Sequence, residues 1–128
     1  SIGLVGSEMC IRDSNHRPAD EDEKEVDFEN AAFGAPHVQT VFAAMNTNTQ
    51  LKLNELISIL SDRPANIIGM TPRPIEKNSL ADITIFDPKE NFDASTLSSK
   101  DEQYSPFDLT NLKGKVIGVV RDGKFNLN

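Results

Sequence analysis

The residues of this chain that could do chemistry are few and lie in its first third. Two histidines, His16 and His37, flank an acidic run from Asp20 to Glu23, and a single cysteine, Cys10, precedes them. The histidines lack the close His-x-His spacing of a zinc pair, and one cysteine allows no internal disulfide. No Ser/His/Asp or Cys/His arrangement and no glycine-rich phosphate loop can be assembled. The residue types alone therefore predict no catalytic site, and the acidic run is interpreted as a solvated loop.

Hydrophobic periodicity predicts helices after this polar region. Residues 15–30 have no period and are predicted to be a loop. A short helix is predicted over residues 64–68, with Ser61 or Asp62 as its cap and Gly69 at its end. Before it, apolar residues recur at helical spacing in two stretches, namely Val38, Val41, Phe42 and Met45, and then Leu53, Leu56, Ile57 and Leu60.

After residue 70 the apolar residues alternate, which is the pattern of strands. A first strand is predicted over residues 81–86, ending at Asp87-Pro88, and a second over residues 116–120, largely apolar on both faces and therefore expected to be covered. The polar residues between them are predicted to be a surface excursion. Asp122-Gly123 suits a two-residue hairpin turn, because both positions need a positive φ. Residues 124–127 are then the returning strand.

Charge and composition exclude several classes of function. The formal net charge is -7 and the sequence pI is about 4.7, whereas nucleic-acid binding needs clustered Lys and Arg. No apolar stretch approaches the ~20 residues of a membrane helix, and the first residues lack the pattern of a signal peptide. The sequence thus predicts no nucleic-acid partner and no membrane contact. With one cysteine and no export signal, the cytoplasm is the expected compartment.

The order of short motifs along residues 14–124 gives the strongest indication of a family. The motifs are Asn15-His16-Arg17-Pro18-Ala19, Asp22-Glu23-Lys24, Phe28 to Gly34, His37-Val38-Gln39-Thr40, Arg63-Pro64-Ala65-Asn66-Ile67-Ile68-Gly69 and Ala81-Asp82-Ile83-Thr84-Ile85-Phe86-Asp87-Pro88. In this order they resemble the carboxy-terminal end of dihydroorotases, amidohydrolases of the cyclic amidase branch. The family has an Asp-His-Ala-Pro-His signature, a Glu-Glu-Lys loop, helices and a strand ending in Asp-Pro. Hydantoinases and allantoinases share that strand and are the nearest alternatives.

The resemblance implies an α/β fold and a division of the chain. Residues 14–70 would be the end of a metal-dependent (β/α)8 barrel, and residues 71–128 would be part of the small composite β-domain beside it. In the family, amino-terminal strands complete that domain, so one sheet edge is expected to lie open here. Residues 1–13 match neither part and are interpreted as a non-family leader. The family's zinc is held by residues of earlier barrel strands, so no cofactor is expected within this segment, whose main partner would be the rest of its own barrel.

Two departures from the family signature carry the functional prediction. Asn15 stands where the family has a catalytic Asp that exchanges a proton with the attacking hydroxide, and an amide cannot act as that base. Ala19 stands where the family has a His that holds the substrate carboxylate, and Ala has no donor. A one-residue shift of the alignment, with Asp20 as the acid, is the alternative. His16 is interpreted as a loop residue rather than a metal ligand.

Two hypotheses follow for the parent protein. In the first, it is an active zinc dihydroorotase of pyrimidine biosynthesis that closes N-carbamoyl-L-aspartate to dihydroorotate, and this chain is its tail. In the second, it is an inactive relative with a structural role beside aspartate carbamoyltransferase, as the resemblance to inactive bacterial relatives implies, and is itself a homo-oligomer. Asn15 and Ala19 favour the second. A free-standing binding module is weaker, because both helices would expose apolar stripes.

Overall fold

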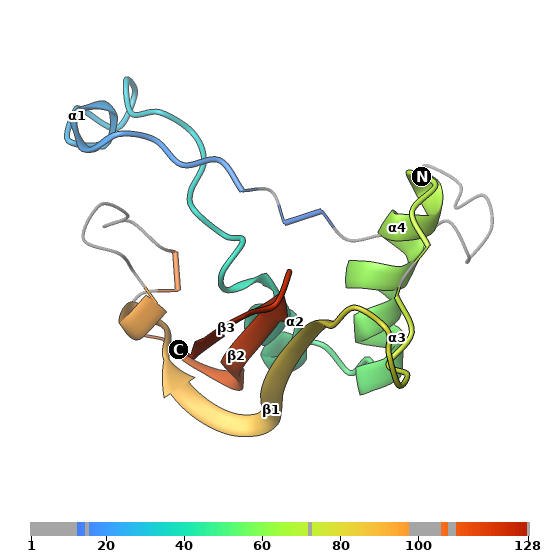
Figure 1. Ribbon diagram of the computed structural model, residues 1–128. Helices are drawn as coiled ribbons and strands as arrows, with labels where there is room; N and C mark the ends of the chain where they lie inside the picture. Colours follow the sequence, from blue (N-terminus) through green and yellow to red (C-terminus); the bar gives the residue numbers. More distant parts are fainter. Residues whose placement is uncertain (1–12, 15, 72, 98–105, 108–109, 128) are drawn as a thin grey trace, which may run out of the picture.

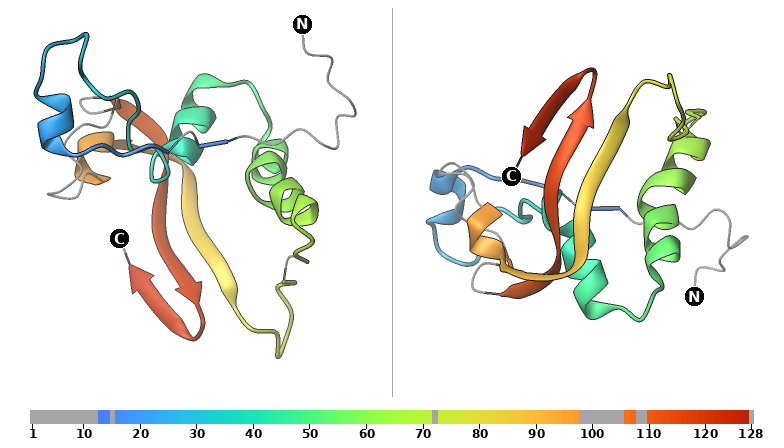
Figure 2. Two further views of the ribbon diagram at one scale, coloured as in Figure 1. Left: turned by 90° about the horizontal axis from the view of Figure 1, so that it is seen from above. Right: turned by 60° about the horizontal axis from the view of Figure 1, so that its bottom comes forward.

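The computed structural model describes residues 13–14, 16–71, 73–97, 106–107 and 110–127 (Figure 1). One three-stranded antiparallel sheet, in the order β1-β2-β3, forms its centre. The one-turn helix α1 and the helices α3 and α4 lie on opposite sides of this sheet in all three views (Figures 1 and 2). The elements in chain order are α1 (Glu21–Lys24), α2 (Val41–Asn48), α3 (Leu53–Ile57), the π-helical turn η2 (Ser58–Asp62), α4 (Arg63–Ile67), β1 (Asp82–Asp93), the 3-10 turn η3 (Ala94–Leu97), β2 (Asn111–Arg121) and β3 (Lys124–Leu127).

Helix α2 packs on the sheet and forms the core with it. The predicted helical stripe is present, and the Phe42 ring meets Phe86 of β1 edge-on, with ring centroids 4.8 Å apart. The helix begins at Val41, later than predicted, so Val38, the first residue of the predicted stripe, lies exposed in the preceding turn. One buried cluster consists of Ala43, Ala94 and Leu112, with Ala44, Phe92 and Phe107 packed against it, and Leu56 of α3 is also buried.

Two polar side chains fasten α2 to the sheet. Asn46 donates from Nδ2 to the carbonyl oxygens of Pro88 at 2.9 Å and Lys113 at 3.0 Å. Thr47 Oγ1 accepts the backbone N–H of Lys113 at 2.8 Å. A partly buried carbonyl or amide without a partner costs free energy, so these bonds fix α2 against both strands at one place.

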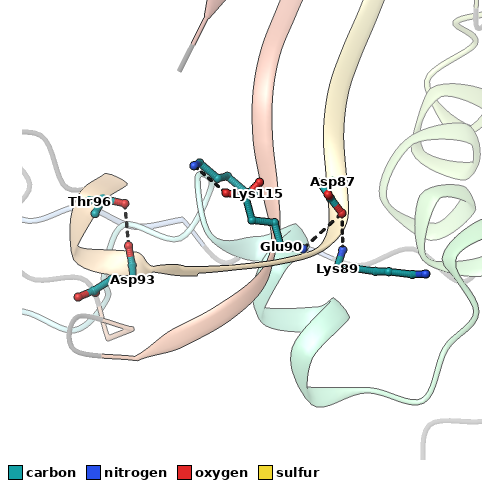
Figure 3. Close-up of polar contacts among 6 residues, drawn as sticks. All are labelled: Asp87, Lys89, Glu90, Asp93, Thr96 and Lys115. Carbon is teal, nitrogen blue, oxygen red and sulfur yellow. Dashed lines mark hydrogen bonds and ion pairs between the residues drawn. The ribbon is translucent and has the colours of Figure 1, made fainter.

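The first strand does not end at Asp87-Pro88 as predicted. Its pairing with β2 is interrupted there and resumes at Asn91, so β1 runs on to Asp93. The Asp87 carboxylate explains the local path, because its Oδ1 accepts the backbone N–H groups of Lys89 at 2.8 Å and Glu90 at 3.3 Å (Figure 3). Pro88 has no N–H to give to the ladder, and the chain passes it as an irregularity inside a strand rather than as a strand end.

The sheet changes its apolar face along its length. Near α2, the apolar side chains of β1 and β2 point toward the helix, as the Phe42–Phe86 contact shows. Directly paired residues share a face, and in the three-stranded half the paired sets are Ile85, Gly118 and Leu127, and Ile83, Val120 and Phe125. Ile85 and Phe86 are neighbours and so point to opposite faces. This second apolar face is largely open at β3, since Phe125 and Leu127 are 52% and 69% exposed. The predicted cover of the second strand is partial, since Val116, Val119 and Val120 are half-buried and Ile117 is 40% exposed.

The predicted second and third helices form one continuous helical run over residues 53–67. The Arg63 N–H bonds the carbonyl of Ser58, five residues back, just before Pro64. Proline removes an N–H from the helical ladder, and a π turn is a known way to absorb such an irregularity. No new helix begins at residue 63, because the helical run continues through it. Asp62 therefore makes no side-chain cap bond, contrary to its predicted role as a cap.

The predicted helix end and hairpin turn are both confirmed. Gly69 has a φ of 72°, and the Met70 N–H bonds the Ala65 carbonyl at 2.8 Å, which is the Schellman arrangement. Asp122 and Gly123 have φ values of 49° and 74° between β2 and β3, as a two-residue hairpin turn requires.

The turn after β1 leads to a pH-dependent prediction. The backbone N–H of Ser95 bonds the Asp93 carboxylate at 3.0 Å, and this bond, with one from the Ser95 hydroxyl, lowers the pKa of Asp93. A pKa that is lower in the folded chain stabilises it above the unfolded pKa, and that stabilisation is lost as the pH falls through the folded pKa. An NMR titration should therefore give Asp93 a lower midpoint in the folded than in the denatured chain.

The controls for this titration separate the two donors. Ser95→Ala removes only the hydroxyl and should raise the Asp93 midpoint part of the way. Thr96→Ala is the matched control, because the Thr96 hydroxyl bonds the Asp93 carbonyl at 2.7 Å and not its carboxylate (Figure 3). Equal midpoints in the folded and denatured chains would contradict the assignment.

Candidate functional site

The segment that resembles the family signature, residues 15–19, is called the signature segment. Its described residues lie beside the turn that precedes α2. Asn15 itself lies outside the described residues, so its placement stays a prediction. His16 forms an isolated parallel bridge with Ala35, and the Arg17 N–H donates to the Ala35 carbonyl at 3.0 Å. Ala19 follows in extended chain and is partly buried. The segment is therefore held to the residues before α2 by main-chain bonds.

The two histidines meet across this contact but not as a ligand pair. His16 Nδ1 accepts the backbone N–H groups of His37 at 3.0 Å and Val38 at 3.3 Å. The His37 ring points elsewhere and meets Phe107 edge-on, with a centroid distance of 6.0 Å. His16 Nδ1 thus serves as an acceptor for main-chain amides, which agrees with its interpretation as a loop residue.

A lysine and a glycine shape the loop between the signature and α2. Lys24 Nζ donates to the carbonyls of Ala32 at 2.6 Å and Gly34 at 2.5 Å. Gly34 has a φ of 118°, and a Cβ there would lie 2.7 Å from both Arg17 Cβ and Arg17 O, so only glycine fits this approach. Sequence reasoning assigned no role to either residue, because a lysine that bonds distant carbonyls has the same local pattern as a solvated one.

The acidic run forms one helical turn rather than the predicted loop. The Asp20 N–H donates to Glu23 Oε2 at 3.2 Å, and the Glu23 N–H donates to the Asp20 carbonyl at 3.1 Å. These reciprocal bonds are typical of a helix start. Asp20, the alternative candidate for the acid, is exposed at this position.

Comparison with known proteins now adds independent information. The chain is 33% identical over 128 residues to the dihydroorotase of Thermoanaerobacter sp. (strain X514), an alignment that covers 95% of the chain and 29% of that protein. The chain is a relative of the dihydroorotases. It is also 28% identical over 127 residues to the dihydroorotase of Thermus aquaticus (95% of the chain, 30% of that protein) and 31% identical over 130 residues to that of Clostridioides difficile (strain 630) (98% and 31%). No protein-family model matches it.

This dihydroorotase relative spans about 30% of the length of the curated proteins that it matches. The coverage is consistent with the carboxy-terminal part of a dihydroorotase-like protein. Because the alignment with the Clostridioides difficile protein takes in 98% of the chain, it extends into residues 1–13, whose separate origin stays a prediction. Residues 1–12 lie outside the described part.

The described residues of this dihydroorotase relative do not fit a zinc site. In the part of the chain that the structure describes, no group of three or more His, Cys, Asp or Glu side chains could hold a metal ion. His16, the histidine within the signature segment, uses its Nδ1 as an acceptor for main-chain amides. None of the described helices is long and apolar enough to cross a membrane.

The charged residues on the sheet are also no candidate site. Lys115 Nζ lies 2.9 Å from Glu90 Oε1 (Figure 3), and both side chains are exposed. Exposed ion pairs of this kind contribute only ~0–1 kcal/mol, and the neighbouring Asp87 carboxylate is used by its own turn. The pair is accounted for as a cross-strand contact beside the irregularity in β1.

We predict that the purified chain binds zinc no better than a generic acidic surface. Its described residues present no ligand set, and zinc in proteins is held by about four N, S or O ligands at close range. Metal analysis after dialysis against a weak chelator should find well below one zinc per chain, unchanged in His16→Ala. Stoichiometric zinc that disappears in His16→Ala or Asp20→Asn would reveal a site at the signature segment.

Proposed function

We propose that this chain is the carboxy-terminal part of a cytoplasmic dihydroorotase-like amidohydrolase of pyrimidine biosynthesis, and that its parent is catalytically inactive. The parent would instead be a structural partner of aspartate carbamoyltransferase. One observation carries the proposal, which is the residue content of a single pentapeptide. Asn15 replaces the family's proton-transferring Asp and Ala19 replaces its substrate-binding His, while Pro18 keeps the register.

The contacts of the signature segment support a loss of chemistry without a loss of fold. The segment is held by the Arg17–Ala35 main-chain bond, by the close approach of Gly34 and by His16 Nδ1. These contacts use main-chain atoms and one imidazole. The segment therefore keeps its place without a carboxylate at position 15 or an imidazole at position 19, as a protein retained for its shape requires.

The exposed apolar surface supports the proposal that an upstream barrel belongs beside this chain. Phe28 and Phe33 are 95% and 85% exposed, and Ile67, Ile68 and Met70 are exposed at the end of α4. Apolar exposure on this scale marks a surface that another structure covers. We assign residues 14–70 to the end of the family's (β/α)8 barrel and residues 71–128 to its small β-domain. Helix α2 lies at their junction, because it packs on the sheet.

The names of the relatives favour a second candidate function. All of the relatives cited above are named dihydroorotase, and none of those names is that of a hydantoinase or allantoinase. The parent would then be an active zinc dihydroorotase, with Asp20 or another acid taking over the proton from position 15. The upstream sequence distinguishes the candidates, since an active parent needs the family's zinc ligands.

The structural role is tested by mixing the full-length parent with aspartate carbamoyltransferase from the same organism. Light scattering after size exclusion should show one complex of defined stoichiometry, and the parent alone should be a homo-oligomer. The matched control is an active dihydroorotase from another organism, which should not replace the parent. A parent that stays separate at micromolar concentration and turns over dihydroorotate would establish the second candidate.

A further inference from the structure

We infer that His16 is a positioning residue, which holds the signature segment to the turn before α2 through the lone pair of its Nδ1. The inference rests on the proposed function only for the identity of residues 15–19 as the signature. Its evidence is the set of bonds that His16 makes. It therefore applies whether the parent is active or inactive.

A single nitrogen of His16 accepts two hydrogen bonds. Nδ1 of His16 accepts two backbone N–H groups, from His37 at 3.0 Å and from Val38 at 3.3 Å. A nitrogen that accepts cannot carry a hydrogen, so the imidazole is neutral with its hydrogen on Nε2. Two donors from consecutive residues also fix the orientation of the ring. The main chain of His16 pairs with Ala35, so backbone and side chain are both committed to the same short stretch.

The His37 carbonyl and helix α2 connect this contact to the sheet. The His37 carbonyl accepts the N–H groups of Thr40 at 3.0 Å and Val41 at 2.9 Å. The Thr40 hydroxyl donates to the same carbonyl at 3.2 Å, and Thr40 is buried. Helix α2 then follows and is fastened to β1 and β2 by Asn46. The placement of the signature segment relative to the sheet is thus set by a chain of contacts that begins at His16 Nδ1.

The bonds of His16 restrain the main chain of the signature segment. His16 stands inside the signature segment, so bonds that fix its ring and its main chain hold this segment against residues 35–38. Arg17, on the other side, is confined by Gly34. His16 therefore acts on the signature segment by holding its main chain in place.

The test compares two substitutions that differ in where an acceptor is placed. In His16→Asn the side-chain oxygen lies about where Nδ1 lies, whereas in His16→Gln it lies one bond farther out. Hydrogen exchange by NMR on the 15N-labelled 128-residue chain should show the His37 and Val38 amides protected in His16→Asn. In His16→Gln and His16→Ala they should exchange roughly 5–10-fold faster, the effect of losing one or two hydrogen bonds. His37→Asn is the matched control, and it should leave Val38 protected.

A second measurement on the unaltered chain keeps the inference testable if a variant fails to fold. The 15N shifts of the His16 ring should show an unprotonated Nδ1 and a protonated Nε2. The opposite tautomer would overturn the inference, and so would unchanged exchange in His16→Ala, or exchange in His16→Asn as fast as in His16→Ala. Amides of β1 and β2 report the global fold in each variant. No readout involves catalysis, so these results do not depend on whether the parent is active.

Discussion

The full-length parent protein, even when loaded with zinc, should show no measurable hydrolysis of dihydroorotate. Under the proposed alignment Asn15 stands where the family has its general base, and removing such a group costs roughly 10²–10⁴-fold in rate. Under the same alignment Ala19 would lack the family's contact with the substrate carboxylate, which adds a penalty of ~1–3 kcal/mol. Neither change disturbs the described contacts of the segment, which are made by main-chain atoms and His16. The measurement is a steady-state assay in both directions of the reaction.

Paired variants make this assay informative whichever way it turns out. Asn15→Asp with Ala19→His should restore some turnover if the upstream zinc ligands are present. The same pair in a parent without those ligands should remain inactive. Asp20→Asn in the unaltered parent tests the alternative acid. Robust turnover by the unaltered parent that Asp20→Asn abolishes would replace the proposed inactivity with a relocated acid.

Local sequence signals predicted local structure well in this chain. The hairpin turn at Asp122-Gly123 and the helix end at Gly69 were both predicted and are both confirmed, with the positive φ values that each turn requires. These elements depend on one or two residues and their immediate neighbours. The helical stripe of α2 is likewise a short-range pattern, although the helix begins later than predicted because Val38 lies in a turn.

The path of β1 could not be predicted, because it depends on a residue far away in the sequence. Asp87-Pro88 has the local pattern of a strand end, since proline has no N–H for the ladder. In the structure the Pro88 carbonyl finds a donor in Asn46, which also bonds Lys113, 67 positions farther along the chain. Such a bond exists only once α2 has docked, and no window around Pro88 contains that information.

In the candidate site, too, some features could be predicted from local sequence and others could not. The proposed departures at Asn15 and Ala19 rest on the order of motifs in the sequence and stay predictions. The use of His16 Nδ1 could not be predicted, because its partners at His37 and Val38 are 21 and 22 positions away. The same holds for Lys24, whose amine bonds carbonyls 8 and 10 positions farther along.

Replacing Gly114 by alanine should destabilise the chain by about 2–5 kcal/mol. Gly114 has a φ of 112°, and the left-handed region costs other residues ~1–2 kcal/mol. A Cβ there would lie 2.7 Å from Phe42 Cε1 and 3.3 Å from Asn46 Nδ2, and overpacking of this kind adds ~1–3 kcal/mol. The Phe42 ring has little freedom to move, because it already meets Phe86 edge-on. The measurement is the free energy of unfolding in urea.

Two further variants separate the backbone term from the clash. Gly69 also has a positive φ, of 72°, but has no atom within 4 Å of an added Cβ, so Gly69→Ala should cost only the backbone term of ~1–2 kcal/mol. Adding Phe42→Leu to Gly114→Ala should restore part of the lost stability, because the smaller side chain vacates the position of the ring edge. In the unaltered background Phe42→Leu should be destabilising, as large-to-small core changes are. If Gly114→Ala costs no more than Gly69→Ala and Phe42→Leu gives no rescue, then α2 does not approach β2 as closely as described, and the contacts of Asn46 and Thr47 across the same interface would have to be reassigned.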